Sequence, residues 1–158
     1  MQSGENINID KIGLGFASEF LHFLDEKKRI IIPSVWRDIV GEPKSIYVLP
    51  GLNECCLYVY PTRQWNQRLT RLHQTSYSDP KARMFLRVLA SQSELLSWDA
   101  QGRIRIKDSL LNYAKLVNEV RMVGAWDRFE LWSPSEWQKV IESVDQATME
   151  EGRRSANI

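Results

Sequence analysis

Apolar and polar residues alternate with a period of two in several short segments, which is the pattern of half-buried β-strands. The first segment covers residues 16–24, and the next covers 30–32, where Pro33 ends the run. Segments 46–49 and 56–60 flank a Pro-Gly turn and predict a β-hairpin. Four further strands are expected later in the chain, at 95–98, 103–107, 120–123 and 129–132.

Longer segments with apolar residues every three or four positions predict amphipathic helices. One begins at Thr62, a second at the Asp-Pro pair 79–80, and a third at the Ser-Pro-Ser-Glu segment 133–136, which forms a capping box. The residues expected on their buried faces are Trp65, Leu69, Leu72, Ala82, Phe85, Leu86, Leu89, Trp137, Val140, Ile141 and Val144. Residues 150–158 are charged and are expected to fray.

The chain contains an internal duplication. Asp25 with Arg29 near the start returns as Asp99 with Arg103, at an offset of 74 positions (99 minus 25, and 103 minus 29). Each pair flanks three turn residues and is followed by a strand and a short helix. Solenoids need three or more units, so two copies predict two half-domains that complete one core. Each half alone, at about 50 residues, buries too little apolar surface to fold by itself.

We therefore expect a β-rich α+β fold in which two pseudo-symmetric half-domains close a small barrel, with a helical linker hairpin and a C-terminal helix. The expected segments are a flexible N-terminal arm at 1–15, a first repeat at 16–66, a helical linker at 67–92, a second repeat at 93–138, and a C-terminal helix and tail at 139–158. The six tryptophans are best explained as packing residues at matched positions, and an exposed platform for stacking bases is the alternative.

The overall composition says little about function, whereas the distribution of charge along the chain is more informative. The 158 residues are 43% hydrophobic and 26% charged, which is typical of a globular protein. No apolar run approaches the ~20 residues of a membrane span, so we expect no membrane partner and a cytoplasmic location. The net charge is only +1, but between Cys55 and Ser93 six Lys and Arg occur with one acid. This excess can attract a polyanion, although a solvated helix face is the simpler explanation.

The sequence lacks the residue motifs that are typical of enzyme active sites. His22 and His73 have no partners at the spacing of a zinc site or of a Cys-His nucleophile, and Cys55 and Cys56 are adjacent, which is unsuited to a structural disulfide. There is no carboxylate pair at helical spacing and no glycine-rich phosphate loop. We expect no catalysis, metal, cofactor or small-molecule substrate.

The duplicated turns carry the candidate chemistry. A turn aspartate can accept backbone N–H groups two residues on and can orient an arginine across the loop. An arginine held in this way presents its guanidinium fork to guanine or phosphate, and Lys27 and Lys28 beside Arg29 add attraction for phosphate. In the second copy Arg103 and Arg105 alternate with isoleucines, which makes one face of the strand cationic. The alternative is that the Asp-Arg pairs only stabilise their turns.

Five motifs in fixed order give the chain a resemblance to a known family. They are D-E-K-K-R-I-I-I-P-S-V-W-R at 25–37, L-Y-V-Y-P-T-R-Q-W at 57–65, D-P-K-A-R-M-F-L-R at 79–87, D-A-Q-G-R-I at 99–104 and V-G-A-W-D-R-F-E-L-W-S-P-S-E-W at 123–137. Together they resemble the MraZ family of bacterial transcriptional regulators, and the likeness covers most of the chain.

The resemblance implies two AbrB-like (SpoVT-AbrB) half-domains that fold as one swapped-hairpin barrel and assemble into a ring homo-oligomer. It also implies binding to direct repeats of double-stranded DNA in the protein's own promoter, usually to repress the division and cell-wall gene cluster, and hence a nucleoid-associated location. The family's D-x-x-x-R motif matches Asp25 with Arg29 and Asp99 with Arg103.

The chain departs from the family pattern at three places. Lys28 stands where the family usually has glycine, the pair 107–108 replaces a proline, and the arm at 1–15 is longer than usual. The predicted DNA-binding residues are Arg29, Lys27, Lys28, Arg103 and Arg105, with Asp25 and Asp99 orienting the arginines. We expect the first turn to make the main contact. The alternative function is a structural or protein-interaction ring oligomer in which the turns only stabilise the fold.

Overall fold

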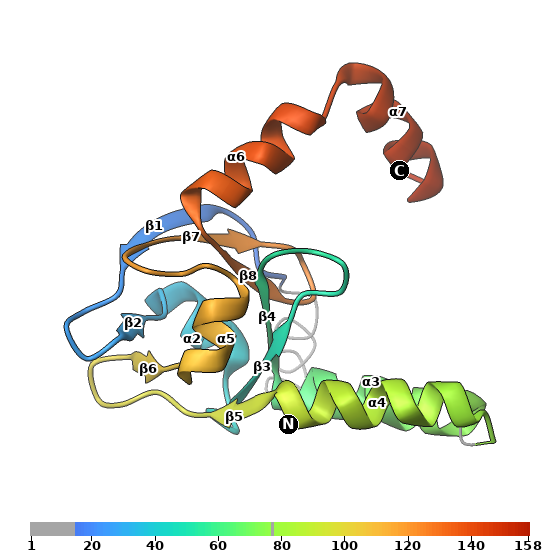
Figure 1. The fold of residues 1–158 in the computed structure, drawn as a ribbon, viewed down its shortest axis with the longest axis horizontal. Helices are drawn as coiled ribbons and strands as arrows, with labels where there is room; N and C mark the ends of the chain where they lie inside the picture. The colour runs from blue at the N-terminus through green and yellow to red at the C-terminus, as the bar shows by residue number, and fades with distance from the viewer. Residues whose placement is uncertain (1–14, 77) are drawn as a thin grey trace, which may run out of the picture.

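The computed structural model describes residues 15–76 and 78–158, which form an α+β fold (Figure 1). Two antiparallel sheets and six helices make up the described part of the chain. The arm predicted at 1–15 lies outside the described residues, except for Gly15.

Eight strands form the two sheets in these described ranges. They are β1 (Glu19–Phe23), β2 (Arg29–Ile31), β3 (Ile46–Pro50), β4 (Leu57–Pro61), β5 (Glu94–Leu96), β6 (Arg103–Arg105), β7 (Glu119–Gly124) and β8 (Phe129–Trp132). The larger sheet has the order β1-β7-β8-β4-β3-β5, and β2 pairs with β6. The predicted strands are found, but β1, β5 and β6 are shorter than expected, because β1 pairs with its partner over five residues and β5 and β6 over three each.

The helices are α2 (Ser34–Val40), α3 (Thr62–Ser76), α4 (Pro80–Gln92), α5 (Asp108–Tyr113), α6 (Pro134–Ser143) and α7 (Gln146–Ser155). Their capping groups confirm the predicted starts of α4 and α6. The Asp79 carboxylate accepts a hydrogen bond from the backbone N–H of Lys81 at 2.9 Å. The Ser133 hydroxyl accepts one from the backbone N–H of Glu136 at 3.2 Å. These side chains satisfy backbone donors that the first turn of a helix leaves without partners.

The first strand of each copy pairs with the hairpin of the other copy. β1 lies antiparallel to β7, with Glu19 opposite Val123, and β5 lies antiparallel to β3, with Leu96 opposite Ile46. The two hairpins, β3-β4 and β7-β8, join through β4 and β8. The two halves therefore share one sheet and complete one core, as the duplication predicts.

The short ladder between β2 and β6 joins the two copies a second time. Ile30 lies opposite Ile104 at its centre, Arg29 lies opposite Arg105, and Ile31 lies opposite Arg103. The ladder is thus nearly symmetric, with equivalent turns entering it from its two ends. The loops that precede β2 and β6 both lie on the left of Figure 1, away from α3, α4 and α7.

The expected closed barrel is not formed in the described part of the chain. The larger sheet ends at β1 on one side and at β5 on the other, and β2 pairs only with β6. β2 and β6 have only three residues each, and side chains of α2 and α5 join theirs in the core. The prediction of a closed sheet was wrong, and the prediction of an α+β fold is confirmed.

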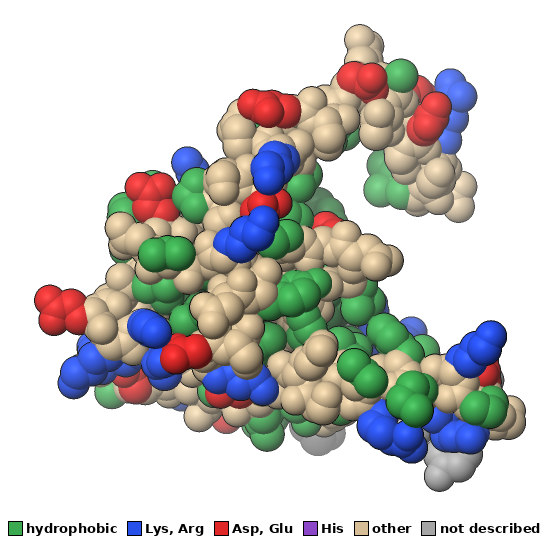
Figure 2. Space-filling view, in the orientation of Figure 1, with side chains coloured by type: hydrophobic (Ala, Val, Ile, Leu, Met, Phe, Trp, Pro, Cys, Tyr) green, Lys and Arg blue, Asp and Glu red, His purple; other side chains and the backbone are tan. Residues whose placement is uncertain are grey.

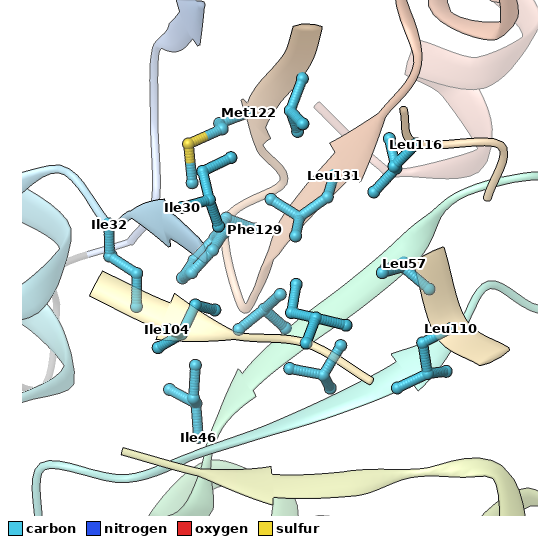
Figure 3. Packing of buried hydrophobic residues seen from close by; sticks show 14 of the residues in the cluster. Ile30, Ile32, Ile46, Leu57, Ile104, Leu110, Leu116, Met122, Phe129 and Leu131 are labelled. Atoms are coloured by element: carbon cyan, nitrogen blue, oxygen red, sulfur yellow. The ribbon is translucent and has the colours of Figure 1, made fainter. Parts of the chain in front are cut away.

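Apolar side chains from both copies fill the space between the larger sheet and the β2-β6 pair (Figure 3). Ile30 and Ile104 are buried side by side with Phe129 and Leu131 of β8. Trp36 of α2 stacks on Phe129 with 4.6 Å between the ring centroids. Full burial of one such side chain stabilises a fold by about 1.5–3 kcal/mol. The isoleucine that follows each turn arginine therefore anchors the turn to the core.

A second apolar cluster covers the other face of the sheet near α3, α4 and α6. Trp65 lies 4.9 Å from Tyr60 and Trp137 lies 5.5 Å from Trp132, measured between ring centroids. The matching aromatic pairs support the packing role predicted for these tryptophans. Trp126 is an exception: it is 73% exposed because it belongs to the tight turn between β7 and β8, where its φ is 70°.

The C-terminal segment differs from the prediction in two respects. Residues 150–158 were expected to fray, but most of them belong to α7, whose first turn is capped by the Asp145 carboxylate accepting from the backbone N–H of Thr148 at 2.7 Å. Ile141 and Val144 were expected to be buried, but both are exposed. The reason is that α6 and α7 extend away from the sheet (Figure 1), so from α6 only Trp137 and Val140 pack against the second cluster.

Candidate nucleic-acid interface

The carboxylate of Asp25 organises the first duplicated turn. One of its oxygens, Oδ1, accepts hydrogen bonds from the backbone N–H groups of Lys27 at 2.9 Å and of Arg29 at 2.8 Å. The other oxygen, Oδ2, accepts a hydrogen bond from the Nε–H of Arg29 at 2.8 Å. Both oxygens are therefore engaged, and the guanidinium of Arg29 is held in one orientation.

The second turn repeats this arrangement at nearly identical distances. Asp99 Oδ1 accepts from the backbone N–H groups of Gln101 and Arg103, both at 2.9 Å. Its Oδ2 accepts from the Nε–H of Arg103 at 2.8 Å. The sequence analysis predicted that each aspartate orients its arginine, and this geometry is what such a role requires.

These contacts keep the two carboxylates ionised. The backbone N–H of Arg29 is the largest cause that holds the pKa of Asp25 below the ordinary value; desolvation opposes it, and the guanidinium of Arg29 and the backbone N–H of Lys27 lower the pKa further. Arg103 lowers the pKa of Asp99 in the same way. Hydrogen bonds to the charged form of an acid always favour that form. The ion pairs are therefore intact at neutral pH.

Because each arginine uses its Nε–H within the turn, its terminal nitrogens remain available to a ligand. The terminal nitrogens of Arg29 have no hydrogen-bond partner among the described residues, and Arg103 donates one bond, from Nη2 to Gln101 Oε1 at 3.2 Å. The two side chains are each 28% exposed. A fixed guanidinium with an open edge can bind phosphate, or the O6 and N7 atoms of guanine.

The first turn keeps its shape although Lys28 replaces the usual glycine. The φ angle of Lys28 is 59° and that of Gly102, the equivalent residue, is 80°. In both turns the backbone N–H at this position donates to the aspartate carbonyl at 2.9 Å. A non-glycine residue in the left-handed region costs about 1 kcal/mol, which the surrounding hydrogen bonds offset.

Asp108 at the start of α5 joins two of the predicted DNA-binding residues. Lys28 Nζ lies 3.2 Å from Asp108 Oδ1, and Arg105 Nη2 lies 2.9 Å from the same oxygen. These two cations lower the pKa of Asp108. Arg105 also donates from Nη1 to the carbonyl of Ile106. Lys28 and Arg105 are therefore partly neutralised, whereas Lys27 forms no ion pair in the described part of the chain.

The structure brings the predicted residues to one side of the molecule. Arg29 and Arg105 are opposite each other in the β2-β6 ladder, and Arg103 lies opposite Ile31 at its other end. Figure 2 shows Lys and Arg side chains gathered over β2 and β6, with some acidic side chains among them. The alternation that predicted a cationic face on β6 is confirmed, because Arg105 is exposed and Ile104 is buried.

Sequence reasoning missed two residues at this surface. Asp108 was noted only as part of a departure from the family pattern, yet that departure, an acid beside a basic strand, was a usable signal. Arg37 of α2 contacts the second turn, as described below. Its equivalent in the second copy is the buried Leu111, so a search for features that both copies share could not find it.

The basic stretch between β4 and β5 is partly used within the fold. Arg68 Nη2 lies 2.7 Å from Asp127 Oδ2, and its guanidinium lies over the ring of Tyr60 at 5.2 Å. Arg63 donates to the backbone carbonyl of Glu42. These contacts favour a structural role for part of the stretch over a role in steering a polyanion.

No group of three or more His, Cys, Asp or Glu side chains forms a metal site within the described ranges. Both cysteines are free thiols, and burial raises the pKa of Cys56. None of the helices that the structure describes is long and apolar enough to cross a membrane.

Comparison with known proteins gives a consistent result. Residues 16–88 and 89–156 each match the sequence model of the family described as "MraZ protein, putative antitoxin-like". The two matches correspond to the two copies of the duplicated turn. The MraZ resemblance noted in the sequence is thus confirmed by a match over most of the chain.

Named relatives agree with the family match. A protein of Finegoldia magna is 37% identical over 124 residues, covering 78% of this chain and 85% of its own. One of Clostridium acetobutylicum is 36% identical over 128 residues, covering 81% and 88%. One of Halothermothrix orenii is 35% identical over 132 residues, covering 84% and 90%. Each of these relatives is named "Transcriptional regulator MraZ".

Proposed function

Because the chain belongs to the MraZ family, we propose that it is a sequence-specific DNA-binding transcriptional regulator and not an enzyme. The observation that carries this proposal is the duplicated turn. Asp25 and Asp99 each fix an arginine by its Nε–H and leave the outer edge of the guanidinium open. Two equivalent turns, each presenting an oriented arginine, suit the grooves and phosphates of double-stranded DNA.

The residues proposed to contact DNA keep the roles expected from the sequence, with one refinement. Arg29 and Arg103 contact bases or phosphates, and Lys27 contacts a phosphate. Lys28 and Arg105 reach DNA only when they release Asp108, since both are paired with it. Their contribution is therefore smaller than that of an unpaired cation.

We further propose that the protein acts as a ring homo-oligomer on direct repeats in its own promoter, and that it represses a division and cell-wall gene cluster. A single pair of short turns offers a small interface, so repetition of the contact along evenly spaced sites supplies the affinity. Linked weak contacts gain a factor of about 10²–10⁴ when their spacing matches. The site of action in this proposal is the nucleoid, within the cytoplasm.

The exchange of strands between the copies supports a finer assignment of the fold. β1 crosses to the hairpin of the second copy, and β5 crosses to that of the first. We assign this arrangement to the swapped-hairpin type of the AbrB-like domains, in an open form. The assignment matters for function because the β2-β6 ladder then links the two turns, which enter it from opposite ends.

A second candidate function is a structural or protein-interaction ring, in which the turns only stabilise the fold. Apolar grooves beside α4 favour this alternative. One groove of about 530 Å³ is lined mainly by apolar residues of β3, α3 and α4, among them Leu49, Leu69 and Leu86. Phe85 and Val88 of α4 are about half exposed nearby. Such surfaces are typical of contacts between proteins.

A mobility-shift titration separates the two functions. The probe is a labelled duplex of the protein's own upstream region, with a shuffled duplex of equal length and composition as the control. DNA binding through several Lys and Arg predicts that the logarithm of affinity falls with the logarithm of salt concentration, by about 0.9 for each phosphate contacted. If neither duplex is bound at low salt, the DNA-binding function is wrong and the interaction ring remains.

A further inference from the structure

The guanidinium of Arg37 of α2, in the first copy, packs against Gly102 in the turn of the second copy. Its Nε–H donates to the carbonyl of Ile32 at 3.0 Å, which fixes the guanidinium near the end of β2. The backbone N–H of Ile32 in turn donates to the carbonyl of Gly102 at 2.9 Å. The second turn is therefore completed by a cation that the first copy supplies.

This contact depends on the absence of a side chain at Gly102. A Cβ atom placed there would lie 2.6 Å from Cζ and 2.7 Å from Nε of Arg37, which is closer than such atoms approach. The φ of 80° also disfavours any other residue. In the first turn the equivalent residue is Lys28, and its side chain extends to Asp108 instead. The two copies thus use the same position in different ways.

The charge of Arg37 is left uncompensated by this arrangement. No carboxylate forms an ion pair with it in the ranges that the structure describes, and its terminal nitrogens have no hydrogen-bond partner there. The nearest turn acid, Asp99, already accepts three hydrogen bonds, from Gln101 and twice from Arg103. A half-buried guanidinium with unused donors, packed against the turn that also orients Arg103, has the chemistry to bind an anion.

We propose that Arg37 is a phosphate-binding residue of the DNA surface and that Gly102 is glycine because it must admit this side chain. The inference rests on the proposed DNA-binding function and adds a residue to it. It also gives the second turn a share in binding comparable to that of the first. Among the described residues, Lys27 at the first turn and Arg37 at the second form no ion pair, whereas Lys28 and Arg105 share Asp108.

The test compares the salt dependence of DNA binding among variants. In Arg37→Ala, each subunit that engages DNA loses one phosphate contact. The slope of log affinity against log salt therefore falls by about 0.9 per engaged subunit. Because phosphates carry no sequence information, the loss is the same on the upstream duplex and on an unrelated duplex. Arg154→Ala, on exposed α7 far from β2 and β6 (Figure 1), is the matched control and leaves the slope unchanged.

Two further variants keep the proposal testable if Arg37→Ala folds poorly. Arg37→Lys keeps the charge and therefore the slope, with weaker binding because the guanidinium fork is lost. Gly102→Ala displaces Arg37 and lowers the slope as Arg37→Ala does, and combining the two changes lowers it no further. Circular dichroism and sedimentation confirm the fold and the assembly of each variant.

The outcomes separate this inference from the function on which it rests. An unchanged slope in Arg37→Ala, or weaker binding without a change of slope, shows that Arg37 acts only through the fold and overturns the proposal. A further loss of slope on adding Gly102→Ala to Arg37→Ala overturns the role given to Gly102. If the wild type itself binds no duplex, the proposed function fails, and this inference fails with it.

Discussion

Arg29 and Arg105 lie directly opposite each other in the antiparallel ladder of β2 and β6. Like charges at facing positions destabilise a sheet, so each needs an acid. Arg29 is held by Asp25 of its own turn, and Arg105 is held by Asp108 of α5. The two cations are therefore kept close together by separate carboxylates, which hold both guanidinium groups at the same surface.

The first prediction concerns the guanidinium fork of the turn arginines. Arg29→Lys keeps the charge but loses bidentate geometry and the Nε–H bond to Asp25. If Arg29 reads a guanine, we expect a loss of about 1–3 kcal/mol, close to 5- to 150-fold, on the upstream duplex only. Fluorescence anisotropy on upstream and shuffled duplexes measures this, with Arg103→Lys as the matched change in the second copy. Equal losses on both duplexes would assign Arg29 to a phosphate.

The second prediction concerns Asp108. Asp108→Asn releases Lys28 and Arg105, so DNA binding becomes tighter at low salt. The slope of log affinity against log salt becomes steeper by up to about 1.8 per engaged subunit if each of the two released cations gains a phosphate contact. The effect on stability is small, because both pairs are exposed and screened by solvent. Anisotropy titrations over a salt series provide the measurement.

The chain offers a close control for the Asp108 variant. Glu136 of α6 also joins two cations, Lys115 at 3.1 Å and Lys139 at 3.0 Å. Glu136→Gln removes the same charge away from β2 and β6 and leaves the salt slope unchanged. Weaker or unaltered binding by Asp108→Asn, with the control also unaltered, would show that Lys28 and Arg105 do not reach DNA.

The duplication made much of the fold predictable. Strands, helix starts and the Asp-Arg turns follow from local patterns that occur twice, and each copy checks the other. Differences between the copies could not be found in this way. Arg37 and Asp108 each contact the turn of the opposite copy, across the β2-β6 ladder, through pairings that only the folded chain creates. The exposure of Ile141 was unpredictable for a related reason: helical periodicity identifies an apolar face but not whether the fold supplies a partner for it.

The third prediction concerns acid pH. Hydrogen bonds from Arg29 and Arg103 hold the pKa values of Asp25 and Asp99 below the ordinary 3.8. As pH falls through 3.8, the unfolded chain binds protons at these residues before the folded chain does, so the free energy of unfolding decreases. The stabilisation is complete above this range and is lost below it.

Urea denaturation at about pH 5 and about pH 3 tests this linkage. In Asp25→Asn/Asp99→Asn, the decrease in unfolding free energy between the two conditions is smaller than in the wild type. Glu26→Gln removes a carboxylate of the same turn that accepts no hydrogen bond within the described residues, and we expect it to behave like the wild type. An identical pH dependence in the double variant and the wild type would mean that the turn contacts are not kept in solution.

The fourth prediction concerns the contact that fixes the two turns to one core. Ile30 and Ile104 are paired at the centre of the β2-β6 ladder and are both 1% exposed. Each change to alanine costs about 2–5 kcal/mol, and the double change departs from additivity by 0.5 kcal/mol or more, roughly the range for residues in contact. Leu89 belongs to the second cluster, so Ile30→Ala and Leu89→Ala should add within about 0.5 kcal/mol. If the losses of unfolding free energy caused by Ile30→Ala and Ile104→Ala are strictly additive in urea denaturation, the two turns are not energetically coupled. A single DNA surface shared by the two turns then loses its support.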